Sequence, residues 1–186
     1  MEAADFKSTI LRLPAVYGPR DEQSRLYEFL RRMDDGRPAI ILPQHRAIFR
    51  WTHSYIVNVG YAIGLSVTNK QAAGRIYNVG SPEALSVAEW VREIGRAVGW
   101  RGQVVVLPNE QLPHSLRWKG AENQDLIVDS SQIRNGLGFS EIVSFGKGLA
   151  STIEWLRANH PQNAHQHFDY ATEDKLLRLP GLGYIG

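Results

Sequence analysis

The sequence predicts a single α/β domain, and three observations support that prediction. Short β-branched or apolar runs alternate along the chain with stretches whose apolar residues repeat at helical spacing. The 186 residues are 43% hydrophobic and 22% charged, which is ordinary for a globular protein and excludes collagen-like, low-complexity and disordered chains. There is also no internal repeat and no linker strong enough to divide the chain.

The first elements are a strand, a turn and a helix. Residues 8–14 form a β-branched, apolar run that Pro14 closes, and the turn residues of 17–21 follow it. A helix ending at Gly36 is predicted next, because four apolar residues recur at positions i, i+3, i+4 and i+7: Leu26, Phe29, Leu30 and Met33. Two short extended segments are expected at 39–42 and 47–52. A second helix follows, with apolar residues at helical spacing from Ile56 to Val67.

The middle of the chain contains the clearest helix start. A buried strand is expected over residues 75–80. Ser86 and Glu89 then form a capping box, and Leu85 with Trp90 can form the hydrophobic staple around it. The helix continues to a glycine at position 99, which suits the residue after a helix end. A β-branched strand follows at 103–107.

The C-terminal third is expected to contain two further helices. Residues 111–124 read as a loop and 126–128 as an extended segment. Asp129 or Ser130 would cap a short helix through Leu137. A last helix begins at Ser144 and continues through Leu156. We therefore expect one unit over residues 1–161, and we treat 162–186 as a tail of uncertain order, because the composition turns polar and the end lacks a helical period.

Composition excludes several function classes. Net charge is only +2, and the arginines are scattered among acids rather than gathered in a basic stripe, so we expect no nucleic-acid partner. The chain has no cysteine, which excludes disulfides, thiolate metal sites and a cysteine nucleophile. No apolar run approaches the roughly 18 residues of a membrane span, so we expect a soluble, cytoplasmic protein without a membrane partner.

Several catalytic and ligand-binding motifs are missing. There is no Gly-x-Gly-x-x-Gly fingerprint, no phosphate loop and no Gly-x-Ser-x-Gly elbow. Gly146-Lys147-Gly148 is better interpreted as tight packing in the first turn of a helix. His165, His167 and Asp169 have a spacing that could hold a metal, but solvated side chains are the preferred interpretation, and we predict no metal site.

Four stretches, in order, resemble the extended short-chain dehydrogenase/reductase family, which comprises the NAD-dependent epimerases and dehydratases. The first is Leu-Arg-Leu-Pro-Ala-Val-Tyr-Gly-Pro-Arg-Asp at 11–21. The second is Arg-Trp-Thr-His-Ser-Tyr-Ile-Val-Asn-Val at 50–59. The third is Gly-Arg-Ile-Tyr-Asn-Val-Gly-Ser at 74–81. The fourth is Asp-Ser-Ser-Gln-Ile-Arg-Asn-Gly-Leu-Gly at 129–138, with Ile-Glu-Trp at 153–155.

The resemblance implies a fold and a set of site residues. The fold would be the C-terminal part of a Rossmann-like doubly wound sheet together with the small substrate-binding subdomain. A nicotinamide cofactor, NAD or NADP, would lie beside a run of four residues, Pro14, Ala15, Val16 and Tyr17. A small-molecule substrate, such as a sugar or nucleotide-sugar, would meet a second set, Arg20, Arg50, His53 and Tyr55.

Two departures from the family pattern shape the functional expectation. None of the seven tyrosines has Lys four residues later, so the family's catalytic Tyr-x-x-x-Lys is absent, as is its Gly-rich cofactor loop. The position of the family's substrate arginine falls on Trp51, with Arg50 one residue away on the opposite face of a strand.

We therefore expect the substrate-binding half of an NAD(P)-dependent epimerase, dehydratase or reductase, inactive alone and without a catalytic residue of its own. Met1 would be an internal start, and the cofactor half would come from the full-length chain or from a separate one. The alternative is a non-catalytic relic of the family that binds a small molecule or a protein.

Overall fold

Six short strands pair into three two-stranded parallel sheets within residues 7–120, 124–161 and 168–178, the parts of the chain that the computed structural model describes. The pairs are β1 (Ile10–Arg12) with β5 (Ile76–Asn78), β2 (Ala15–Tyr17) with β4 (His53–Tyr55), and β3 (Ala39–Pro43) with β6 (Gln103–Leu107). Helical segments lie between the partners of each pair, as parallel pairing requires. The predicted α/β class is confirmed.

Seven α-helices accompany the strands in the described parts of the chain. They are α1 (Tyr27–Asp34), α2 (Gln44–Ile48), α3 (Ile56–Thr68), α4 (Val87–Val98), α5 (Ser131–Leu137), α6 (Phe145–Ala158) and α7 (Tyr170–Leu177). None of these helices has the length and apolar character needed to cross a bilayer.

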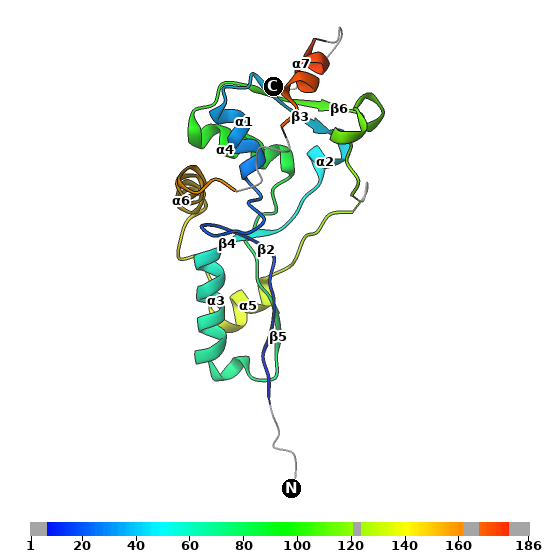
Figure 1. The fold of residues 1–186 in the computed structure, drawn as a ribbon. Helices are drawn as coiled ribbons and strands as arrows, with labels where there is room; N and C mark the ends of the chain where they lie inside the picture. Colours follow the sequence, from blue (N-terminus) through cyan, green and yellow to red (C-terminus); the bar gives the residue numbers. More distant parts are fainter. Residues whose placement is uncertain (1–6, 121–123, 162–167, 179–186) are drawn as a thin grey trace.

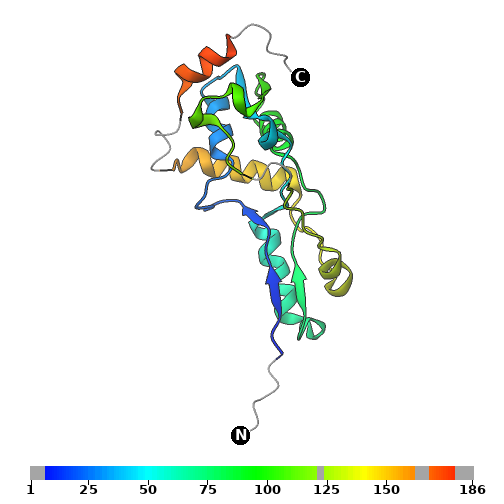
Figure 2. The same cartoon turned by 90° about the vertical axis from the view of Figure 1, so that its right-hand side faces the viewer.

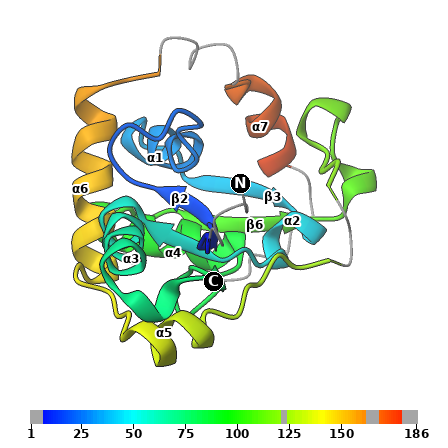
Figure 3. The ribbon, with the colours of Figure 1, turned by 90° about the horizontal axis from the view of Figure 1, so that it is seen from below.

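The molecule is elongated and has two ends (Figure 1). The lower end holds β1, β5, α3 and α5, and the upper end holds β3, β6, α1, α4 and α7. The short sheet of β2 and β4 lies at the junction, and the view from the side shows the same division (Figure 2). Seen from below, α1 lies between α6 and α7 (Figure 3).

Each end has its own hydrophobic core. In the upper end, α1, α4 and α6 pack together through fully buried side chains such as Leu30, Ile94 and Leu156. In the lower end, Val59 of α3 and Ile133 of α5 pack on Tyr77 of β5. The junction between the cores is therefore a natural place for a cleft.

The start of α4 agrees with its sequence signal. The Glu89 backbone N–H donates to Ser86 Oγ at 3.3 Å, and the Ser86 backbone N–H donates to Glu89 Oε2 at 2.7 Å. Gly99 ends the helix with φ +70°, a left-handed conformation that glycine adopts without a Cβ penalty.

The predicted strand over 8–14 contains β1, and a second strand, β2, which was not predicted, follows Pro14. β1 ends at Arg12 and pairs with β5, whereas β2 begins at Ala15 and pairs with β4. Pro14 lies between them, where its missing N–H and fixed φ interrupt a ladder. β2 therefore forms a separate strand at the junction, and Tyr17, which was expected to begin the turn, is its last residue.

The segment 47–52 was only partly predicted. Ala47 and Ile48 belong to α2, which follows directly on β3, and Pro43 precedes its first residue with an extended φ and ψ. A helix of five residues is too short for apolar spacing to distinguish it from a strand. Arg50 and Trp51 are extended, as expected, and form isolated bridges to Ser86 and Leu126.

Residues 170–177, which sequence analysis assigns to a tail of uncertain order, form α7. Its Glu173, 2% exposed, accepts two hydrogen bonds from Arg32 of α1 at 2.9 and 2.6 Å. Asp174 pairs with Arg37, and Tyr170 donates to Asp35 at 2.6 Å. Leu176 is buried against β3 and β6, and Leu177 packs beside it, so polar and apolar contacts hold the helix together. His165 and His167 lie outside the described residues.

Candidate functional site

Two cavities meet at the junction of the two ends. The first, which we call the carboxylate cavity, has a volume of about 380 Å³. Its polar wall consists of His53, Asn58, Ser81, Glu83, Glu93 and Glu141. Its apolar wall consists of Tyr17, Leu85, Trp90, Val143 and Phe145, with Pro82 at the turn after β5. Apart from His53, its titratable side chains are three carboxyl groups and the Tyr17 phenol, so it presents an excess of hydrogen-bond acceptors.

The second, which we call the arginine cavity, has a volume of about 310 Å³. Its aromatic wall consists of Phe29, Phe49, Trp51, Trp90 and Trp118. Two cations, Arg25 and Arg46, lie in this wall beside Glu28. The arginine cavity therefore combines flat apolar surfaces with guanidinium groups.

The two cavities share three lining residues, His53, Leu85 and Trp90. β4 positions His53, because His53 pairs with Ala15 of β2. The capped first turn of α4 positions Trp90, and Leu85 precedes that cap. The sequence features that start α4 thus also build the partition between the cavities.

Aromatic rings form a continuous row past this partition. The ring centroids follow one another in the order Trp118, Phe49, Trp51, His53, Trp90 and Phe145, at spacings of 5.7, 6.3, 5.3, 4.9 and 5.3 Å. Spacings of 4.5–7 Å are those of favourable aromatic pairs. The row makes the walls of both cavities rigid and provides them with flat faces.

His53 has a defined tautomer. Its Nδ1 lies 2.7 Å from the carbonyl oxygen of Trp51, and a carbonyl oxygen can only accept, so Nδ1 carries the proton. Burial lowers the pKa of His53, and the positive charge of Arg25 lowers it further. The hydrogen bond to the Trp51 carbonyl and the negative charge of Asp21 oppose this shift without cancelling it. The ring is therefore neutral at pH 7.

Tyr17 and Tyr55, which face each other across β2 and β4, have different roles. Tyr17 lines the carboxylate cavity and packs against Trp90 at 5.1 Å, and burial together with the neighbouring Tyr55 raises the pKa of its phenol. Tyr55 lines neither cavity and supports Tyr17 from behind at 5.6 Å. Gly148 of α6 lies so close to Tyr55 that a Cβ there would come within 2.8 Å of its Cγ. The tight packing predicted for Gly146-Lys147-Gly148 is confirmed at Gly148 and is wrong at Gly146, where a Cβ would meet nothing within 4 Å.

The two arginines are held by acids and carbonyls while their faces stay on the aromatic wall. Arg25 donates through Nη1 to the Val16 carbonyl at 2.8 Å and to Asp21 at 2.6 Å, and its guanidinium lies 5.9 Å from the Trp51 ring. Arg46 pairs with Glu28 and lies 5.9 Å from the Trp118 ring.

Two buried donors beside the cavities have no hydrogen-bond partner, namely Trp90 Nε1 and Arg25 Nε. Such groups carry a desolvation cost when they stay unpaired.

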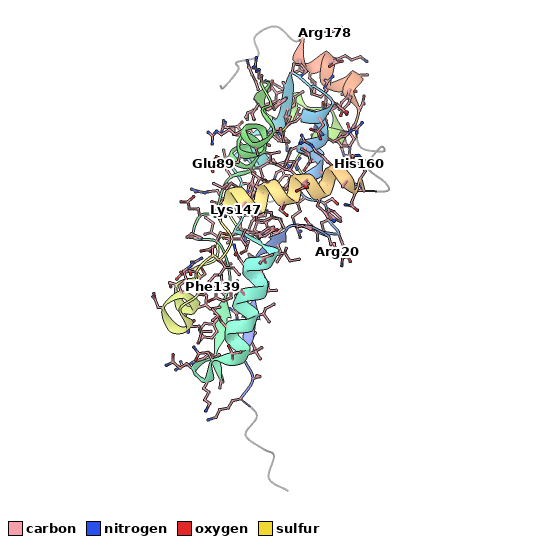
Figure 4. The ribbon with its side chains drawn as sticks, turned by 90° about the vertical axis from the view of Figure 1, so that its left-hand side faces the viewer. Arg20, Glu89, Phe139, Lys147, His160 and Arg178 are labelled. Carbon is pink, nitrogen blue, oxygen red and sulfur yellow. The ribbon has the colours of Figure 1, made fainter. Side chains whose placement is uncertain are left out.

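The remaining residues predicted to bind a cofactor or substrate lie outside both cavities. Pro14 and Val16 are half-buried at β2, and Ala15 is buried and donates to the Thr52 carbonyl at 3.2 Å. Arg20, in a left-handed conformation with φ +67°, is exposed on the loop after β2 (Figure 4). Arg50 donates through Nε to the Ala84 carbonyl at 2.9 Å and does not line either cavity. Of the eight predicted residues, the structure thus brings Tyr17 and His53 together in the carboxylate cavity.

Sequence analysis missed most of the arginine cavity. Its two arginines and the aromatic residues Phe49 and Trp118 come from separate segments that meet only in the folded chain. One available signal was Trp51, at the position of the family's substrate arginine, because it lines the cavity while Arg50 points away.

Neither a metal nor a whole dinucleotide finds its ligands among the residues that the structure describes. No group of three or more His, Cys, Asp or Glu residues among the described ones could hold a metal ion. The sequence lacks the Gly-x-Gly-x-x-Gly turn whose backbone cradles the pyrophosphate of NAD. These residues do not fit NAD on their own, and no chemical step is derived through it.

Comparison with known proteins identifies sequence relatives among sugar-nucleotide enzymes. No family model matches the chain. It is 28% identical over 149 residues to a dTDP-glucose 4,6-dehydratase of Streptomyces griseus, covering 78% of this chain and 42% of that relative. It is 23% identical over 154 residues to a UDP-N-acetyl-alpha-D-glucosaminuronate decarboxylase of Bacillus cytotoxicus, covering 80% of this chain and 46% of that relative. The chain thus spans less than half the length of these relatives.

Solved structures share the fold. A UDP-glucose 4-epimerase of Thermotoga maritima with UDP-glucose matches with a TM-score of 0.62 at 24% identity, covering 82% of this chain and 46% of that one. A dTDP-glucose 4,6-dehydratase of Bacillus anthracis in complex with NAD matches with a TM-score of 0.61 at 18% identity, covering 80% and 44%. Sequence and fold together identify the chain as a homologue of the C-terminal portion of the extended short-chain dehydrogenases/reductases, the epimerase and dehydratase type.

Proposed function

We propose that this chain is the substrate-binding part of an NAD-dependent sugar-nucleotide epimerase, dehydratase or reductase, and that its ligand is a nucleotide-sugar. The observation that carries the proposal is the pair of adjoining cavities with opposite chemical character. One is aromatic and cationic, the other is rich in carboxylates, and His53, Leu85 and Trp90 belong to both.

The arginine cavity suits a nucleoside diphosphate. Flat aromatic side chains stack on a nucleobase, a contact worth about 1–3 kcal/mol per base. Arg25 and Arg46 would lie beside the diphosphate, because a guanidinium forms charge-assisted hydrogen bonds to phosphate oxygens.

The carboxylate cavity suits the sugar. A sugar presents hydroxyl donors, and three carboxylates line the cavity: Glu83, together with Glu93 and Glu141, whose charges are paired with Arg96 and Arg134. Glu83, which forms no ion pair among the described residues, disfavours a phosphate there and so favours one orientation of the ligand over the reverse. Tyr17 and Trp90 offer apolar ring faces to the C–H face of a sugar.

The nicotinamide and the catalytic groups would come from a cofactor half outside the described residues. We propose that Pro14, Ala15, Val16 and Tyr17 lie beside the nicotinamide of NAD or NADP when that half is present. The chain alone is proposed to be inactive, because no tyrosine in it is followed by the lysine that would lower its pKa.

An open sheet face supports a docked cofactor half. Ile10 and Ile76 are register partners of β1 and β5 and are 49% and 45% exposed, while their neighbours Leu11 and Tyr77 pack inward. Parallel sheets are normally covered on both faces. We propose that the cofactor half covers this face, from the same polypeptide or from a second one.

A non-catalytic binding protein is the second candidate. It is favoured by the missing Tyr-x-x-x-Lys taken by itself. Such a protein would bind the same nucleotide-sugar, but it would show no redox activity when an NAD-loaded cofactor half is supplied.

Calorimetric titration of the purified chain tests the ligand class. We expect UDP-glucose or dTDP-glucose to bind, UDP to bind more weakly, and glucose and NAD alone not to bind measurably. Arg46→Met should weaken nucleotide-sugar binding by about tenfold, because it removes a charge-assisted contact worth about 1.5 kcal/mol. The matched control is Arg157→Met, which removes an exposed arginine paired with Asp34 outside both cavities. No binding of either nucleotide-sugar, or equal effects of both variants, would contradict the proposal.

A further inference from the structure

His53 lies at the partition of the two cavities with one ring nitrogen committed and the other free. Nδ1 donates to the Trp51 carbonyl at 2.7 Å. No hydrogen bond to Nε2 is made by any side chain or backbone group in the described parts of the chain, and Nε2 is not one of the sealed, unpaired atoms of the interior. The neutral ring therefore carries an Nε2 lone pair with no partner among the described residues, on a side chain that lines both cavities.

The ring is held rigidly in this orientation. It packs against Trp51 at 5.3 Å and against Trp90 at 4.9 Å. The backbone of His53 pairs with Ala15, and its carbonyl accepts from the Ser81 N–H at 3.1 Å. An acceptor whose position is fixed by neighbours discriminates between ligands more sharply than a mobile one.

We propose that His53 is a specificity-determining residue whose Nε2 accepts a hydrogen bond from one hydroxyl of the bound sugar. This inference rests on the proposed function. His53 would select a sugar with a hydroxyl at that position over one with a hydrogen, a keto oxygen or an ether oxygen there, because only a hydroxyl can donate to Nε2.

The surroundings make His53 an acceptor rather than a base. Burial and Arg25 lower its pKa, so the imidazolium that proton abstraction would create is disfavoured. The charged groups that act on the ring are Arg25 and Asp21, and the other charged residues that line the two cavities are Glu28, Glu83, Glu93, Glu141 and Arg46. Because the pKa of His53 is lowered, Nε2 gains a proton only at a pH below the ordinary histidine pKa, where it would turn from acceptor into donor. Affinity should therefore be flat around pH 7 and fall in acid.

The test compares UDP-glucose with analogues lacking one sugar hydroxyl each, bound to the wild-type chain and to His53→Phe. In the wild type, the analogue that lacks the hydroxyl bound by His53 should bind about 5- to 10-fold more weakly than UDP-glucose. In His53→Phe, which keeps a ring of similar size, the penalty for that one analogue should disappear, while the penalties for the others remain. Equal penalties in both proteins would overturn the assignment, although the proposed function would stand.

A second measurement avoids the variant altogether. Long-range ¹H–¹⁵N spectra of the wild-type chain should show His53 as the Nδ1–H tautomer, and the Nε2 signal should shift when UDP-glucose binds. An Nε2–H tautomer, or a bound complex in which Nε2 does not shift, would overturn the inference. If no nucleotide-sugar binds in calorimetry, the proposed function fails and the role of His53 fails with it.

Discussion

At the scale of single residues, close approaches and hydrogen bonds decide what each position tolerates. Gly148 and Gly146 lie in the first turn of the same helix, yet only Gly148 faces a neighbour. Its contact with the Tyr55 ring supports Tyr17, which lines the carboxylate cavity. The two glycines therefore form an internal comparison.

Gly148→Ala should destabilise the fold by about 1–3 kcal/mol, because its Cβ would come within 2.8 Å of Tyr55 Cγ in a packed core. Gly146→Ala, whose Cβ meets nothing within 4 Å, should be neutral or stabilising by up to about 1 kcal/mol. Urea unfolding of the two variants checks this. Equal stabilities would show that α6 can move away from Tyr55.

Glu89 makes a pH-dependent contribution at the start of α4 (Figure 4). Hydrogen bonds from the Ser86 backbone and hydroxyl lower the pKa of Glu89 below its ordinary value of 4.5. Because the pKa of Glu89 is lower in the folded than in the unfolded state, its carboxylate stabilises the fold fully at a pH above the unfolded-state pKa. That stabilisation is lost as the pH falls through the folded-state pKa.

Glu89→Ala should therefore cost about 1 kcal/mol at pH 7 and progressively less below pH 4.5. The free energy of unfolding, measured against urea from pH 7 to pH 3 for both proteins, provides the comparison. Glu154→Ala, on the exposed face of α6, is the control. A constant difference across this pH range would exclude the carboxylate as the source.

At the scale of elements, α7 joins the rest of the molecule through a buried ion pair as well as through its apolar residues Leu176 and Leu177. Its buried Glu173 joins it to Arg32, and the side chain of Arg37 lies 3.7 Å from the second Glu173 oxygen. Removing one partner of a buried ion pair typically costs 3–5 kcal/mol, because the other charge stays buried.

Glu173→Gln should loosen α7 while leaving the rest of the upper end folded. We expect amide exchange over 170–177 to accelerate at least tenfold, with α4 unchanged, in hydrogen-exchange mass spectrometry. The control is Glu154→Gln. Unchanged exchange in α7 would mean that Asp174 and Tyr170 anchor the helix without Glu173.

How far the sequence predicts each element depends on where its stabilising contacts lie. α4 was predicted from Ser86 to Gly99 because its cap, staple and end are all local. α7 was not, since its anchor residues Arg32 and Glu173 are far apart in the chain. The unpredicted strand at 15–17 depended in the same way on its partner at 53–55.

The candidate site follows the same rule. Tyr17 and His53 were predicted through ordered motifs, whereas Arg25, Arg46 and Trp118 carry no motif and meet only when the upper end folds. A single sequence contains no local signal for such an assembly.

At the scale of the whole molecule, the uncovered face of β1 and β5 is the feature that a partner would change. Changing both Ile10 and Ile76 to lysine should leave the free energy of unfolding within about 0.5 kcal/mol, because both side chains are already exposed. The same change should lower the binding of a hydrophobic dye to the isolated chain. Val67→Lys, at an 80% exposed position on α3, controls for added charge. Unchanged dye binding would place the exposed apolar surface elsewhere.

We propose that a nucleotide-sugar occupies both cavities in one orientation. A crystal structure of the chain with UDP-glucose tests it most directly. We predict the uridine and diphosphate against Trp51, Trp118 and Arg46, and the glucose beside His53 and the carboxylates of the other cavity. A reversed ligand, or UDP-glucose bound outside both cavities, would contradict the claim.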